Sequence, residues 1–89
     1  METDEARLKR LRMRSWRRGT KEMDLVMGPW ADAHLADLGD AALTLYDGLL
    51  EENDQDLALW VMGNAPLPDR FAALIGEIAA FARSRLPRH

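Results

Sequence analysis

Apolar residues recur every three or four positions along most of this chain, which is the spacing of one face of an α-helix. The spacing is most regular near the C-terminus, where the apolar positions are Phe71, Leu74, Ile75, Ile78, Phe81 and Ala82. Residues that favour strands are scarce, because Val, Ile and Thr together number seven against 27 for Ala and Leu. The pattern predicts an all-α fold.

Capping and turn residues divide the first part of this pattern into two helices. The first is expected over residues 4–15, with Thr3 as its N-cap. It ends at residues 17–19, where Gly19 is expected to take the left-handed conformation that closes many helices. The second helix is predicted to start behind an N-cap at Thr20.

A proline lies inside the second predicted helix. The apolar stripe continues past Gly28 and Pro29 to Leu35. Pro29 has no N–H to donate to the carbonyl of Leu25, so we expect a kink or a break at this point. Trp30 is expected to pack in the core.

Three further helices are predicted. Asp40 is expected to cap the third, and Asn53 or Asp54 the fourth. Asp69 lies near the expected start of the fifth, which closes at residues 86–87. The result is a small bundle of five helices joined by short turns.

Length and composition agree with a single helical domain over residues 1–89. The 89 residues are 47 % hydrophobic and 30 % charged, which is an ordinary globular balance. We expect frayed ends at residues 1–6 and 87–89. The chain has no Cys, which excludes disulfides and thiolate chemistry.

Neither a membrane span nor a secretory signal is predicted. The longest run without Asp, Glu, Lys or Arg covers residues 57–68, whereas a bilayer needs about 20 apolar residues. Acidic residues stand near the N-terminus, where a signal peptide would be basic and then apolar. We therefore expect a cytoplasmic protein of bacterial type.

The net charge of −3 conceals a strong asymmetry along the chain. Residues 7–21 hold eight basic residues and no acid, and residues 22–69 hold eleven acids and neither Lys nor Arg. Two interpretations are open: either the basic segment packs on the acidic one, or the basic first helix is solvated and the surface has two electrostatic poles.

Four arginines of the basic segment are expected to share one helical face, which suits contact with phosphates. They are Arg7, Arg10, Arg14 and Arg17. The acidic balance of the rest of the chain would repel a polyanion, so no nucleic-acid partner is expected.

The sequence shows no set of residues that would together form a catalytic or metal-binding site. The only histidines are His34 and His89, too few for a metal site. The acidic run at residues 51–56 lacks the glycine and the final glutamate of a calcium loop. We predict no catalytic, cofactor-binding or metal-binding residue, and hence no enzyme.

The segment around the first predicted turn carries a recognisable motif, Arg18-Gly19-Thr20-Lys21-Glu22. Taken as structure alone, Gly19 turns the chain, Glu22 complements the positive N-terminus of the second helix, and Arg18 pairs with Glu22.

This motif resembles the Arg-Gly-x-x-Glu signature of the succinate dehydrogenase assembly factors, the SdhE type of bacteria and their mitochondrial counterparts. The likeness extends over residues 7–85, through the Leu-Tyr-Asp-Gly-Leu-Leu stretch at 45–50 and the Asp-x-Asp-Leu-x-x-Trp stretch at 54–60. The resemblance implies a five-helix protein that binds the flavoprotein subunit of succinate dehydrogenase, and in bacteria also that of fumarate reductase. It promotes covalent attachment of FAD, which belongs to that client, and it meets the membrane only through the client.

The resemblance also implies which residues meet the client. Arg18 is expected to donate to a client carboxylate or carbonyl, and Gly19 to allow close backbone approach. Glu22 either accepts from client donors or holds Arg18 in place. The full set of expected partner-binding residues is Arg18, Gly19, Glu22, Arg17, Asp24 and Trp16.

One alternative function stays open. The basic first helix also fits an antitoxin-like or nucleic-acid-binding regulator, and family members have been described as antitoxins. Binding to DNA that weakens steeply with salt distinguishes this alternative from the assembly role.

Overall fold

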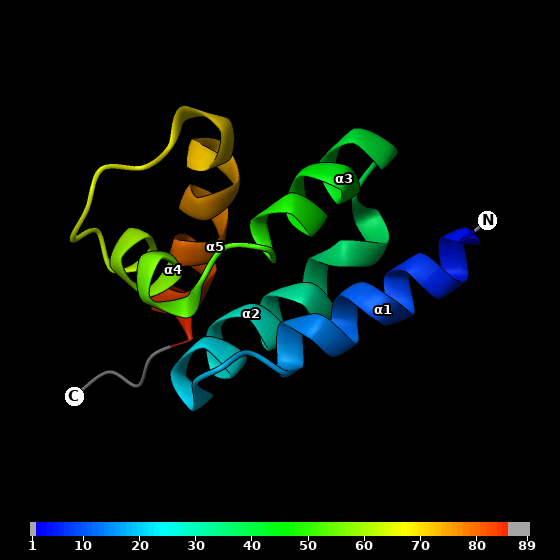
Figure 1. Cartoon of the computed structure of the whole chain (residues 1–89), viewed down its shortest axis with the longest axis horizontal. Helices are drawn as coiled ribbons and strands as arrows, with labels where there is room; N and C mark the ends of the chain where they lie inside the picture. The colour runs from blue at the N-terminus through cyan, green and yellow to red at the C-terminus, as the bar shows by residue number, and fades with distance from the viewer. Residues whose placement is uncertain (1, 86–89) are drawn as a thin grey trace.

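Five α-helices and two 3₁₀ turns make up the part of the chain that the structure, a computed structural model, describes: residues 2–85 (Figure 1). The elements are α1 (Asp4–Trp16), α2 (Lys21–His34), η1 (Leu35–Asp37), α3 (Asp40–Leu49), α4 (Asp54–Val61), η2 (Asp69–Phe71) and α5 (Ala72–Ser84). The predicted all-α, five-helix fold is confirmed. The expected helix end at residues 86–87 and the frayed end at 87–89 lie outside the described residues.

Three of the predicted N-caps are present, and each side chain accepts a backbone N–H three residues later. The bonds are Thr3 from Ala6 (3.1 Å), Thr20 from Met23 (3.3 Å) and Asn53 from Asp56 (2.9 Å). These bonds satisfy donors that a helix start leaves free, which explains why α1, α2 and α4 begin where they do.

The fourth predicted cap, Asp40, is wrong by one position. Gly39 occupies the N-cap of α3 and makes no side-chain capping bond. The carboxylate of Asp40 instead accepts from Arg7 at 2.7 Å. A cross-helix ion pair has therefore replaced the local cap.

Helices α1 and α2 lie side by side, with α3 against them at one end of the molecule (Figure 1). Helix α5 packs on both α2 and α4 at the other end. Helix α1 runs from one end of the molecule towards the other, α2 runs back, and α3 returns the chain towards the α4–α5 pair (Figure 1). No helix within residues 2–85 is long and apolar enough to cross a membrane.

The core centres on Trp30, which is only 1 % exposed and stacks on Tyr46 with ring centroids 5.1 Å apart. The Tyr46 hydroxyl lies 2.6 Å from the hydroxyl of Ser15, so α1 and α3 share a buried hydrogen bond. The predicted burial of Trp30 is confirmed, and Trp60 packs half-buried against the same core. Burial raises the pKa of Tyr46 to about 12.

The break expected at Pro29 is not found, because α2 runs through it from Lys21 to His34. The neighbouring Gly28 has a packing role instead. A Cβ at Gly28 would lie 2.3 Å from Cδ2 of Trp16, so only glycine lets the indole rest on this helix. The indole Nε1 also donates to Asp32 at 3.2 Å, one turn further on.

Candidate functional site

The basic face of α1, continued by Arg18 in the turn after it, packs against acidic residues of α3, of the segment that follows α3 and of the first turn of α4. The ion pairs are Arg7–Asp40 (2.7 Å), Arg10–Asp47 (2.9 Å), Arg14–Asp47 (3.1 Å), Arg14–Glu51 (3.0 Å) and Arg18–Asp54 (2.8 Å). The interpretation of basic-on-acidic packing is therefore confirmed for this face. Hydrogen bonding from Arg10 holds the pKa of Asp47 below its ordinary value.

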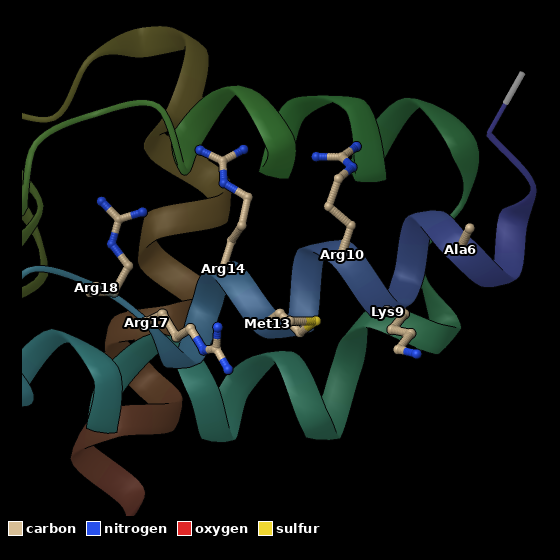
Figure 2. Close-up of a pocket in the computed structure, with 7 residues that line it drawn as sticks. All are labelled: Ala6, Lys9, Arg10, Met13, Arg14, Arg17 and Arg18. Atoms are coloured by element: carbon tan, nitrogen blue, oxygen red, sulfur yellow. The ribbon is translucent and has the colours of Figure 1, made fainter.

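The membership of this face differs by one residue from the prediction. Figure 2 shows Arg10 and Arg14 leaning to the same side as Arg18, whereas Arg17 lies on the other side of the helix. The reason is that α1 ends at Trp16, so the helical spacing no longer applies at Arg17. The arginines expected to contact phosphates are thus largely committed to carboxylates within the chain.

The motif arginine, Arg18, is almost fully enclosed, with its side chain 9 % exposed. All three of its guanidinium nitrogens donate within the chain. Nε donates to Asp54 at 2.8 Å, Nη1 to the carbonyl of Leu50 at 2.7 Å and Nη2 to the carbonyl of Glu52 at 2.7 Å. Arg18 therefore ties the turn after α1 to the segment between α3 and α4.

Asp54 completes this tie from the first turn of α4. One carboxylate oxygen accepts from Arg18, and the other accepts from the backbone N–H of Thr20 at 3.0 Å. The carboxylate is 12 % exposed, and charge-assisted bonds of this kind are about twice as strong as neutral ones. From the sequence, Asp54 was only a possible helix cap, so its part in the site was missed.

Asp24 fixes the same turn from the α2 side. Its carboxylate accepts from the backbone N–H of Arg18. The turn, residues 17–20, is thus held at two backbone positions by two carboxylates from different helices. Such a turn is presented to a partner in one conformation.

Gly19 lies exposed at the centre of this turn, and its expected left-handed conformation is wrong. Within residues 2–85 the glycine with a positive φ is Gly63. The missing side chain of Gly19 matters for a different reason: a Cβ there would lie 2.9 Å from Oδ2 of Asp54, so the carboxylate would have to shift. A side chain at Gly19 meets the chain's own anchor before it meets any client.

Glu22, the last motif residue, is exposed on the first turn of α2. Among residues 2–85 it forms no ion pair, and the expected Arg18–Glu22 pair is wrong because Asp54 takes its place. Arg17 is likewise exposed. The site therefore divides into Arg18 and Asp24, which face inward, and Arg17, Gly19 and Glu22, which face solvent.

Trp16, the remaining predicted contact residue, both packs inward and faces solvent. Its indole is 40 % exposed, yet one side of the ring rests on Gly28. The structure thus leaves an aromatic surface next to the 17–20 turn. The described residues contain no group of three His, Asp or Glu side chains arranged to hold a metal ion.

Fold and site together define a small helical protein that holds a charged turn rigid and presents its outer residues to solvent. Residues 9–82 match the family described as "Flavinator of succinate dehydrogenase". The chain belongs to this family. Its members are assembly factors, in agreement with the resemblance in the motif.

Named relatives support the same membership. A "Succinate dehydrogenase assembly factor 2, mitochondrial" of Meyerozyma guilliermondii is 42 % identical over 73 residues, covering 79 % of this chain and 54 % of that protein. The same-named protein of Schizosaccharomyces pombe is 31 % identical, covering 94 % of this chain and 62 % of its own length. A "FAD assembly factor SdhE" of Acetobacter pasteurianus is 36 % identical, covering 75 % and 62 %.

These relatives also bear on length and location. The chain spans roughly half to three fifths of the relatives named above. The expectation of a bacterial cytoplasmic protein is wrong, because the relatives matched in Meyerozyma guilliermondii, Mycosarcoma maydis and Schizosaccharomyces pombe are mitochondrial proteins of fungi.

Proposed function

We propose that this chain binds the flavoprotein subunit of succinate dehydrogenase and promotes covalent attachment of FAD to it. A fumarate reductase flavoprotein, where one is present, is a second client of the same kind. Family membership supports the client class. The 17–20 turn indicates which residues would meet the client. Its backbone is fixed by Asp54 and Asp24, while Gly19 and Glu22 stay exposed.

The motif residues divide the work between them. Arg18 positions the turn, since its guanidinium donates to three acceptors within the chain. Gly19 lets a client backbone approach, and Glu22 accepts from client donors. Arg18 thus acts through the turn, and this replaces the direct client contact expected from the sequence.

The chain acts as a binding protein in this proposal and is not itself an enzyme. The bond forms within the client, between the client's histidine and the client's FAD, and this chain contributes no reacting group or cofactor. It stabilises the client conformation in which the two reacting groups are aligned. Flavin attachment is therefore accelerated because more client molecules hold their reacting groups in the right orientation.

The nucleic-acid alternative loses its main support in the structure. The arginine face that suggested phosphate contact would need its own cations to be free. The face that carries Arg7, Arg10 and Arg14 is instead paired with Asp40 and Asp47. The assembly role is the function that the site supports best.

The test measures covalent flavin on the succinate dehydrogenase flavoprotein by in-gel fluorescence in cells that lack this protein. Restoring the wild-type chain is expected to restore the signal, and Glu22→Ala is expected to restore little of it. Glu77→Ala, an exposed change on α5, is the matched control and is expected to restore it fully. A signal unchanged by loss of the protein would defeat the proposal.

A further inference from the structure

A second set of basic residues, on α1 and at its C-cap, takes no part in the pairing with α3. Lys9 and Arg17 are exposed, and within residues 2–85 neither forms an ion pair. Met13 lies midway between them in the sequence and is 45 % exposed. We call these three residues, spaced four apart, the α1 stripe.

The α1 stripe borders a groove of about 510 Å³ along the helix (Figure 2). Arg10, Arg14 and Arg18 form one rim, and Figure 2 shows Lys9 and Arg17 on the opposite side of the helix with Met13 between them. The groove thus has an apolar centre with basic residues on both sides. The two rims differ in one respect: the first is already paired with carboxylates and the second is free.

This arrangement has a defined chemical complement. Lys9 and Arg17 are eight residues apart, which is about 12 Å along a helix or its immediate extension. An acidic segment with carboxylates at that separation and an apolar side chain between them would pair both cations and cover Met13. An apolar contact at the centre with polar groups around it is the usual arrangement of a protein–protein interface.

We propose that the α1 stripe docks an acidic segment of the flavoprotein client, with an apolar client side chain on Met13 and client carboxylates at Lys9 and Arg17. The inference rests on the proposed function and extends its contact surface. Arg17 belongs both to the stripe and to the 17–20 turn, so the two surfaces are continuous. One client can therefore run along α1 and reach Gly19.

A protein ligand fits the stripe better than a nucleic acid does. A phosphate backbone presents closely spaced charges and offers nothing apolar to cover an exposed methionine. The arginines that would extend a phosphate track, Arg10 and Arg14, are engaged by Asp47.

The experiment measures the Kd between the purified chain and the purified flavoprotein subunit without covalent flavin, at about 50 mM and about 500 mM NaCl. Lys9→Glu and Arg17→Glu are each expected to raise the Kd about tenfold at low salt and much less at high salt. Met13→Ala is expected to raise it about threefold to tenfold at both. Arg83→Glu, the same charge change on an exposed residue of α5, is expected to leave it unchanged.

The outcomes separate this inference from the proposed function. Failure of the wild-type chain to bind the flavoprotein defeats the proposed function itself. Wild-type binding that Lys9→Glu and Arg17→Glu leave unaltered, in variants with wild-type melting temperatures, defeats the docking surface alone. Salt-dependent binding of a DNA duplex that the same two variants abolish would assign the stripe to nucleic acid and overturn the inference.

Discussion

Arg18 and Asp54 stand 36 positions apart in the sequence and form the most enclosed ion pair between described residues, with Nε 2.8 Å from Oδ1. The other oxygen of Asp54 accepts from the N–H of Thr20. One carboxylate therefore fixes both the side chain and the backbone of the turn. The motif arginine belongs to the fold, and the exposed residues around it are left for a partner.

Removing this carboxylate is expected to destabilise the chain markedly. Asp54→Ala leaves the enclosed Arg18 without its counter-charge and the N–H of Thr20 without its acceptor, which together cost about 2–4 kcal/mol. Urea denaturation followed by circular dichroism measures the loss. Asp37→Ala removes an exposed carboxylate and is expected to cost less than about 0.5 kcal/mol. Equal effects of the two changes would show that Asp54 is not the anchor.

Adding a single methyl group at Gly19 is expected to disturb the same anchor. The new Cβ lies 2.9 Å from Oδ2 of Asp54, so the carboxylate must shift away from Thr20. We expect Gly19→Ala to lower stability by about 1 kcal/mol and to impair flavinylation more than this loss explains. Gly39→Ala is the matched control, since nothing lies within 4 Å of its Cβ. Full flavinylation with Gly19→Ala would contradict the requirement for a fixed turn.

Two helical glycines are expected to respond to alanine with opposite signs. Gly28→Ala forces the Trp16 ring off α2, since its Cβ would lie 2.3 Å from Cδ2, and should cost about 1–3 kcal/mol. Gly76→Ala on α5 meets nothing within 4 Å and should gain about 0.5–1 kcal/mol from helix propensity. Thermal melts measure both, and the indole N–H resonance of Trp16 reports the displacement directly. A stabilising Gly28→Ala would refute the packing role.

Acid is expected to remove the stabilisation that Asp47 gives. Hydrogen bonding from Arg10 lowers the pKa of Asp47 below the ordinary value of 3.8, so the unfolded state takes up the proton first. The contribution is complete above about pH 5 and is lost as the pH falls through the lower, folded-state pKa. Melting temperatures of wild type and Asp47→Asn should therefore differ near neutral pH and converge as the pH falls below the folded-state pKa of Asp47. A constant difference across this range would contradict the assignment.

Local sequence signals were sufficient for most of the fold. The apolar spacing and the capping residues Thr3, Thr20 and Asn53 act through neighbours three or four positions away, so a linear pattern reveals them. The prediction of a break at Pro29 was wrong because it considered only local backbone hydrogen bonding. Residues 27–31 of α2, Pro29 among them, are buried against the rest of the chain, and a linear pattern does not show such tertiary packing.

The site was predictable only as a segment. The motif marked residues 18–22, but the sequence offers many carboxylates as partners for Arg18, and the nearest in the chain, Glu22, is not the one used. Asp54 reaches Arg18 only because the end of α3 returns the chain to α1. The charge asymmetry indicated that such pairing exists without showing which residues pair.

The most direct test of the central claim follows covalent flavin formation in a purified mixture. The unflavinylated flavoprotein subunit is incubated with FAD, with or without the purified chain, and the flavin that survives denaturation is read by fluorescence. The account predicts that the wild-type chain accelerates formation and that Glu22→Ala, folded with a wild-type melting temperature, does not. Equal rates with and without the wild-type chain, or full activity in Glu22→Ala, would contradict it.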